Sequence, residues 1–185
     1  MSLTPWPQTS IEVLARYKVF EVLRARRTSP RTGEDIGFFL IRTGNWVNVI
    51  PLTEDGKVVL VKQFRHGTSE FSLEIPGGIL HDQHEDAAAA AARELREETG
   101  YGAKELVLLG RQRPNPALLT NWCTTYLARG CAKEGDLEMD PGEDIEVVTV
   151  PLHEIDAMVA SGALDHSLVL AAFALWRARG ERSQA

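Results

Sequence analysis

Residues 82–101 read DQHEDAAAAAARELREETGY, and this stretch decides how the rest of the chain is interpreted. Asp82 is a suitable helix N-cap with Glu85 three residues after it, a spacing similar to a capping box. Gly100 is a natural C-terminal stop, because glycine readily adopts the left-handed conformation that ends helices. The stretch therefore predicts a helix over residues 83–99.

This predicted helix has two unlike faces. Residues three or four positions apart share one side of an α-helix, so Glu94, Glu97 and Glu98 lie within about one third of its circumference. Carboxylates this close repel one another unless a cation lies between them, and Mg²⁺ or Mn²⁺ prefers oxygen ligands. The helix also has a thin apolar side that can pack closely on a sheet: Ala87, Ala88, Ala91, Ala92 and Leu95. We expect the acids to point into a cleft.

The alternative is an ordinary solvated helix held by ion pairs. Arg93 and Glu97 stand four residues apart, and runs of charge usually form solvated surface. The preceding residues 74–78, EIPGG, favour a site instead. Paired glycines let the backbone approach a ligand and leave carbonyl groups available to a metal.

Taken together, these segments closely resemble the Nudix box, the signature of hydrolases that act on nucleoside diphosphates linked to another moiety. Six polar or glycine positions keep the spacing of that family: Glu85, Arg93, Glu94, Glu97, Glu98 and Gly100. One departure is that six residues, 79–84, separate Gly78 from Glu85, where the family pattern has five. The extra residue precedes the predicted helix, so it leaves the carboxylate face intact. It leaves open whether the carbonyl of Gly77 or of a neighbour meets the metal.

The resemblance implies roles for these residues. The implied metal ligands are the carboxylates of Glu94, Glu97 and Glu98 and the carbonyl of Gly77. Glu97 and Arg93 are the implied catalytic residues of the helix, with Arg93 orienting an acid of the box, most plausibly Glu85. The implied cofactor is Mg²⁺, for which Mn²⁺ can substitute. The implied mechanism is attack of a metal-activated water on a phosphorus of the pyrophosphate.

A further acid on a distant loop serves several members of that family as metal ligand or general base. Residues 134–146 gather acids around a turn, and Glu143 is our assignment, with Glu146 and Asp140 as alternatives. A solvated acidic loop without function is an equally good interpretation of this turn.

Weaker features indicate the substrate class. Pro116 stands about sixteen residues past the box, which in this family is associated with ADP-ribose hydrolysis. Residues 61–65, VKQFR, resemble a strand end of the same subgroup, and Arg65 offers a planar donor for phosphate, although it could also be a surface arginine. We also assign Trp46 and Ile79 to substrate binding, although an aromatic residue such as Trp46 is more often part of the core.

The resemblance therefore implies hydrolysis of ADP-ribose or a nucleoside diphosphate sugar to a nucleoside monophosphate and a sugar phosphate. Residues 114–121, PNPALLTN, differ from the Ser-Pro-Gly loop of ADP-ribose enzymes, which leaves room for the sugar substrates. The alternatives are another substrate of the family (a dinucleoside polyphosphate, coenzyme A or a damaged nucleotide) and a non-catalytic nucleotide-sensing domain.

The order of elements predicts an α/β fold with a mixed sheet, and the resemblance implies an α/β/α sandwich. Residues 17–27 and 36–43 predict an N-terminal antiparallel hairpin. The remaining expected strands are 46–52, 57–64, 71–75, 104–112, 122–130 and 145–150, and the expected later helices are 152–160 and 166–179. We expect a hydrolase domain over 44–185, preceded by strands in 1–43 that build a homodimer interface.

Composition sets broader limits. The chain has 185 residues, a formal charge of −6 and a pI near 5.4. This negative charge argues against broad electrostatic binding of nucleic acid or of an anionic membrane. Cys123 and Cys131 are too few for a disulfide framework and indicate reduced thiols. The start lacks a signal-peptide pattern and no apolar run is long enough to span a membrane, so we expect a cytoplasmic protein. The five histidines show no ligand spacing and receive no role.

Overall fold

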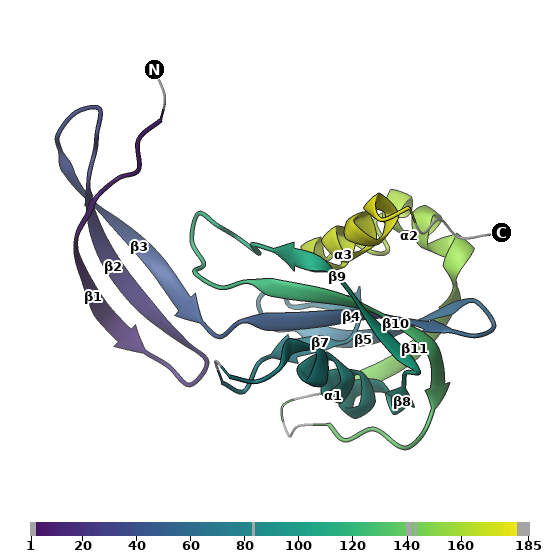
Figure 1. The fold of residues 1–185 in the computed structure, drawn as a ribbon. Coiled ribbons are helices and arrows are strands. Elements are labelled where there is room, and N and C mark those ends of the chain that lie inside the picture. Colours follow the sequence, from purple (N-terminus) through teal and green to yellow (C-terminus); the bar gives the residue numbers. More distant parts are fainter. Residues whose placement is uncertain (1–2, 83, 140–141, 143, 181–185) are drawn as a thin grey trace. The chain divides into compact units, whose positions relative to one another are not determined.

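The computed structural model describes residues 3–82, 84–139, 142 and 144–180 (Figure 1). The chain forms two compact units: Met1–Gly44 with Arg113–Trp122, and Asn45–Gln112 with Cys123–Ala185. Within the described ranges, no helix combines the length and the apolar character needed to cross a membrane.

The smaller unit contains an antiparallel sheet with the order β1-β2-β3. Its strands are β1 (Gln8–Arg16), β2 (Phe20–Thr28) and β3 (Asp35–Thr43). The expected N-terminal antiparallel pairing is confirmed for β2 and β3, but β1 was missed. Almost every residue of β1 is exposed, so the strand lacks the alternation between apolar and polar residues that marks a half-buried strand.

The larger unit is built on a mixed sheet, as expected. Among the described residues it has eight strands with the central order β11-β5-β4-β10-β8, while β6 pairs with β5, β7 with β4 and β9 with β10. β4 and β10 are parallel and the other pairs are antiparallel. The strands are β4 (Trp46–Thr53), β5 (Lys57–Arg65), β6 (Glu70–Glu74), β7 (Gly77–Ile79), β8 (Tyr101–Gly102), β9 (Glu105–Gln112), β10 (Cys123–Lys133) and β11 (Ile145–Pro151).

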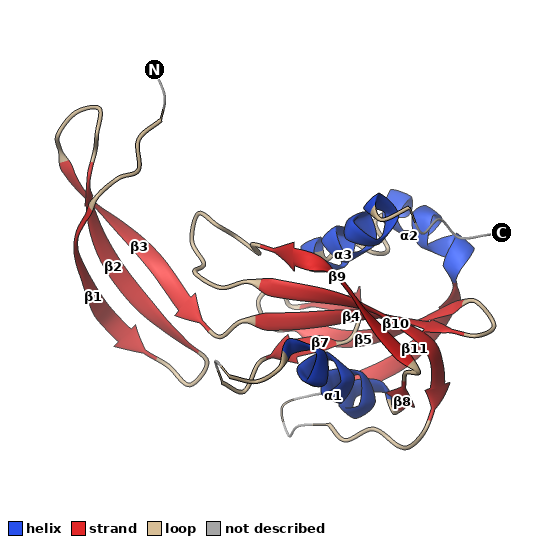
Figure 2. Cartoon of the chain, viewed as in Figure 1, coloured by secondary structure: helices blue, strands red, loops and turns tan. Residues whose placement is uncertain are grey.

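Helices cover both faces of this sheet, so the expected sandwich is confirmed (Figure 2). Helix α1 (Ala87–Thr99) lies on one face. Helices α2 (Ile155–Ser161) and α3 (Ser167–Ala178) lie on the other. The predicted helix over 152–160 begins as a 3₁₀ turn, Leu152–Glu154, before it becomes α-helical.

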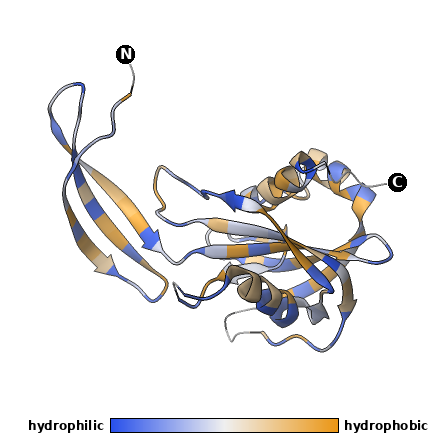
Figure 3. Cartoon of the chain, in the orientation of Figure 1, coloured by the Kyte–Doolittle hydropathy of each residue, from blue (hydrophilic) through white to orange (hydrophobic). Residues whose placement is uncertain are grey.

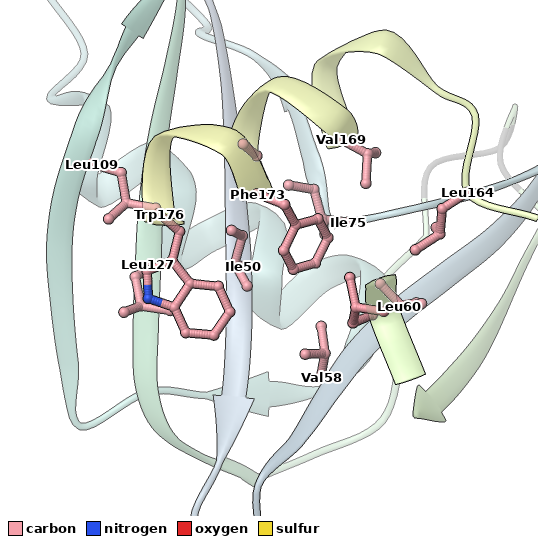
Figure 4. Close-up of a cluster of buried hydrophobic side chains, with 12 residues drawn as sticks. Ile50, Val58, Leu60, Ile75, Leu109, Leu127, Leu164, Val169, Phe173 and Trp176 are labelled. Atoms are coloured by element: carbon pink, nitrogen blue, oxygen red, sulfur yellow. The ribbon is translucent and has the colours of Figure 1, made fainter. Parts of the chain in front are cut away.

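Alternation along the strands divides the core between the two faces. On β4, Val47 and Val49 pack against α1, whereas Ile50 packs against α3. On the α3 side, Phe173 and Trp176 lie over the sheet and form a buried cluster with Ile50 and its neighbours (Figure 4). On the α1 side, small alanines let the helix approach the strands closely. Ala87, Ala88, Ala91 and Leu95 pack there as predicted, whereas Ala92 is exposed and Ala90 is buried instead.

β4 and β5 separate along their length, and this separation positions the site. They pair at Leu52 and Val58, near their hairpin, and further along β6 adds to β5 while β7 adds to β4. The chain between β6 and β7 therefore spans from one strand to the other, and Val49 donates a backbone hydrogen bond to Pro76 at 2.9 Å. This arrangement brings Gly77 and Gly78 beside the middle of the sheet and next to α1.

Candidate active site

Helix α1 begins later than its sequence predicts. Asp86, not Asp82, is the N-cap, and its carboxylate accepts hydrogen bonds from the backbone of Ala88 and Ala89. Asp82 instead caps a turn in the preceding loop by accepting from the amides of His84 and Glu85. Both aspartates suit a cap, and the one adjoining the alanine run takes the role. The C-terminal prediction is confirmed, since Gly100 has a φ of 71°.

The acids of α1 are not a solvated surface. Glu94 and Glu98 are only 8% and 3% exposed, although both are carboxylates. Buried carboxylates are rare unless they are paired or bind a cation. The ion-paired surface interpretation is therefore excluded for these two side chains.

Arg93 lies among the acids. It donates to Glu94 at 3.0 Å, to Glu97 at 2.9 Å and to Glu85 at 3.3 Å. Burial disfavours its charge, but the hydrogen bond to Glu97 and the charges of Glu94, Glu97 and Glu85 prevail and raise the pKa of Arg93. The structure thus brings Arg93 and Glu85 together as the sequence suggested, and the catalytic role of Arg93 stays a prediction.

The glycine turn interlocks with these acids. The backbone N–H of Gly77 donates to Glu98 at 3.0 Å. A Cβ on Gly78 would collide with the carboxylate of Glu94, and one on Gly77 would collide with the carbonyl of Val47. Both glycines are therefore needed for close approach rather than for an unusual φ. Whether the carbonyl of Gly77 meets a metal stays a prediction.

The donor chemistry of this face fits a hard divalent cation. Its acids offer carboxylate oxygens, the ligand type that Mg²⁺ and Mn²⁺ prefer. Within the described part of the chain, no three acidic, histidine or cysteine side chains converge closely enough to hold an ion as they stand. Arg93 contacts one oxygen of Glu94 and one of Glu97, so a cation that binds both acids uses their other oxygens or replaces those contacts.

A cavity of about 380 Å³ adjoins the glycine turn. Its walls come from the start of β4, the end of β5, the β6–β7 segment and the first turn of α3. The structure gathers here four residues that the sequence assigned to the site: Trp46, Arg65, Gly77 and Ile79. Gly78, which also lines the cavity, contacts Glu94, so the cavity and the acidic helix face are neighbours.

Arg65 is held by an acid that the sequence did not single out. Its Nε and Nη2 donate to the two oxygens of Glu74 at 2.7 and 2.8 Å. Burial alone would raise the pKa of Glu74, but these hydrogen bonds, the charge of Arg65 and that of His166 lower it. The bidentate pair fixes an arginine at the cavity wall, where it can face an anion.

Two more cavity residues were missed. Asn48 is buried, accepts from Thr125 at 2.6 Å and donates to the carbonyl of Leu168 at 3.4 Å. His166, which received no role, lines the cavity immediately before α3. No spacing links His166 to the box, because it reaches the cavity through the packing of α3.

The remaining assignments are Pro116, Glu143 and the two alternatives to Glu143. Pro116 belongs to the smaller unit. Glu143 and its alternative Asp140 lie outside the described residues, so their proposed roles stay predictions. The second alternative, Glu146, is an exposed residue of β11 that pairs with Lys62 at 3.3 Å.

Comparison with known proteins agrees with this geometry. A model of the NUDIX domain matches residues 43–173. An ADP-ribose pyrophosphatase of Bacillus subtilis is 35% identical over 116 residues, which cover 62% of this chain and 62% of that protein. An ADP-sugar pyrophosphatase of Mus musculus is 32% identical over 145 residues, or 69% of this chain and 63% of that protein. The chain thus spans about three fifths of the length of the curated relatives that it matches.

A crystal structure of an ADP compounds hydrolase has the same fold. It superposes with a TM-score of 0.84 and 24% identity, over 96% of this chain and 95% of that one.

Proposed function

The chain belongs to the NUDIX domain family, and on this premise we propose that it hydrolyses the pyrophosphate bond of ADP-ribose or a nucleoside diphosphate sugar. The products are a nucleoside monophosphate and a sugar phosphate. The observation that carries the proposal is the interlock of Gly77 and Gly78 with the buried acids Glu98 and Glu94. It joins an acidic helix face to a cavity that contains Arg65.

The proposed cofactor is Mg²⁺, with Mn²⁺ as a substitute, since hydrolases of this family generally use divalent metal ions. Its ligands would be Glu94, Glu97 and Glu98. Such an ion lowers the pKa of a bound water and neutralises charge on phosphate oxygens. Binding it turns the mutual repulsion of the acids into attraction to a shared cation.

Other residues of the chain bind the substrate, orient the acids and exclude water. Arg65 faces a phosphate from the cavity wall, while Glu74 keeps its guanidinium plane in one orientation. Arg93 holds Glu85 and orients Glu97 within the acidic face. Trp46 and Ile79 line an apolar part of the cavity and exclude water from the substrate. Glu143 remains our proposal for the general base.

The substrate class is supported by the relatives named for ADP-ribose and ADP-sugar hydrolysis and by Pro116. A turnover assay should compare ADP-ribose and several nucleoside diphosphate sugars with dinucleoside polyphosphates, coenzyme A and oxidised nucleotides, with Mg²⁺ and with Mn²⁺. We expect ADP-ribose or a sugar substrate to have the largest kcat/KM. No turnover of any substrate would instead support a nucleotide-sensing domain.

We also propose that the N-terminal sheet joins two copies of the chain. It carries large apolar side chains that are exposed in the single chain: Ile11, Val13, Leu14, Tyr17, Val19, Ile36, Phe38 and Phe39. β3 is largely apolar (Figure 3). Exposed apolar clusters of this kind mark interaction surfaces. Light scattering during gel filtration should give the mass of a dimer, whereas a monomer at micromolar concentration would refute this assignment.

A further inference from the structure

A buried carboxylate in the cavity wall lies beside two basic side chains. Glu74 accepts two hydrogen bonds from Arg65, at 2.7 and 2.8 Å. Nε2 of His166 lies 3.6 Å from Oε2 of Glu74, the oxygen that also accepts from Nη2 of Arg65. The side chain of Glu74 is only 5% exposed, whereas that of Arg65 is 44% exposed. Glu74 is therefore the fixed member of the group and Arg65 the member open to a ligand.

The side chain of His166 does not cap the helix that it precedes. It precedes α3 as the N-cap residue but makes no side-chain capping hydrogen bond. Its other ring nitrogen, Nδ1, is buried and has no hydrogen-bond partner among the described residues. A histidine kept only for packing would be expected to satisfy this nitrogen. The ring does, however, approach Glu74 through Nε2.

The backbone around His166 is held in place independently of its ring. Its carbonyl accepts from Val169 at 2.9 Å and from Leu170 at 3.0 Å, in the first turn of α3. Asn48 donates to the carbonyl of Leu168, which ties the same turn to β4. Removing the imidazole should therefore leave the start of α3 where it is.

A phosphate and Glu74 would compete for the N–H groups of Arg65, and this competition is the physical reason for a second basic side chain beside Glu74. When a phosphate of the substrate draws N–H groups of Arg65 toward itself, Glu74 loses part of its hydrogen bonding while remaining buried. A buried carboxylate without donors is costly, and the cost would weaken binding of the phosphate. A donor at Nε2 of His166 can take over as the side chains close together by a few tenths of an ångström.

We propose that His166 is a positioning residue that braces Glu74 and thereby lets Arg65 turn toward the phosphate of the substrate. The link from His166 to Glu74 stands on the geometry alone, while its consequence for substrate rests on the proposed function. The residue acts through Glu74 and Arg65 and has no direct part in the chemical step.

The first test needs no turnover. Nitrogen-15 spectra of the histidine rings are recorded for the full chain with Mg²⁺, and His166→Ala assigns the signals of His166 by their loss. Replacing Glu74 with Gln removes the carboxylate charge but keeps the shape. We expect Glu74→Gln to shift the Nε2 signal of His166, and an unchanged signal would overturn the proposal.

The second test uses kinetics with ADP-ribose. For His166→Ala we expect KM to rise about fivefold, the worth of one hydrogen bond, with kcat changed by less than about twofold. His166→Gln places an amide N–H near the position of Nε2 and should restore KM, whereas His166→Asn reaches only the position of Nδ1 and should not. His153→Ala, a change at an exposed histidine of the 3₁₀ turn, is the matched control.

The outcomes separate the two proposals. Wild-type KM in His166→Ala, equal defects in the Gln and Ala variants, or a fall in kcat alone would each overturn the role of His166. If the melting temperature of His166→Ala falls in parallel with the rise in KM, His166 has only a structural role, and this result would also overturn the proposal. A wild-type chain that leaves ADP-ribose intact would refute the proposed substrate, and the ring spectra would still decide the link to Glu74.

Discussion

Gly78 lies so close to Glu94 that a single added methyl group would collide with the Glu94 carboxylate. The contact joins the segment that enters the cavity to the acidic face of α1. It explains why a glycine stands here in a conformation that other residues could adopt.

Gly78→Ala should therefore displace Glu94. We expect kcat to fall about a hundredfold, since misplacing a group by about an ångström costs that much. Crowding should also lower the free energy of unfolding by about 2 kcal/mol. Turnover and urea denaturation measure the two effects. Gly67→Ala is the control, because nothing lies near the added atom there, and equal behaviour of the two variants would contradict the interlock.

Glu97→Gln and Glu98→Gln should remove Mg²⁺-dependent turnover. Each change deletes a charge that the cation needs but keeps the side-chain shape, so kcat should fall by about a hundredfold or more with little change in melting temperature. Glu105→Gln alters an exposed acid on β9 and should leave the rate unchanged. Wild-type rates in either variant of α1 would refute the metal-binding role of this face.

ADP-ribose or a nucleoside diphosphate sugar should exceed dinucleoside polyphosphates in kcat/KM. The reasons are the association of Pro116 with this substrate class and the size of the cavity beside Gly77 and Gly78. A cavity of about 380 Å³ suits one short diphosphate better than a long polyphosphate chain. Initial rates over a range of substrate concentrations give the comparison. A clear preference for the polyphosphates would contradict the substrate assignment.

Glu74 should make stability depend on pH. Because its pKa is lowered in the folded chain, its contribution is fully present above its ordinary pKa of 4.5 and is lost as the pH falls through the lower folded value. At neutral pH, Glu74→Gln should cost about 1 to 2 kcal/mol, since Arg65 stays partly solvated. The difference from wild type should shrink below pH 4.5 in denaturant titrations.

The control for this effect is Glu54→Gln. Lys104 also lowers the pKa of Glu54, but this pair is exposed and screened by solvent, so the loss of stability should be much smaller. A constant difference between wild type and Glu74→Gln down to strongly acidic pH would show that Glu74 does not titrate as the structure requires.

Both thiols should be inert in the folded protein. Burial raises the pKa of Cys123 to about 12 and that of Cys131 to about 11, so almost no thiolate forms near neutrality. An aromatic disulfide reagent should react with neither thiol in the native chain and with both in guanidinium chloride. Rapid native labelling of either cysteine would show that its surroundings open to solvent.

Much of the fold could be predicted from local patterns. Apolar runs predicted six strands of the larger unit, but the short strands β7 and β8 were missed, because two or three residues carry no periodic pattern. Gly100 ends its helix because few other residues adopt that conformation. β1 could not be predicted in this way, because an exposed strand carries no periodic signal. The start of α1 was misplaced because Asp82 and Asp86 satisfy the same local rule, and propensity alone does not rank them.

The sequence by itself determined the acids of α1, their spacing and the glycines before them, because helical geometry converts spacing along the chain into a shared face. Only the tertiary structure decided that Glu94 and Glu98 are buried against the glycine turn. Only it brought His166 to Glu74, across more than ninety residues of chain. Such contacts depend on how α3 packs on the sheet, and no spacing within one element encodes that packing.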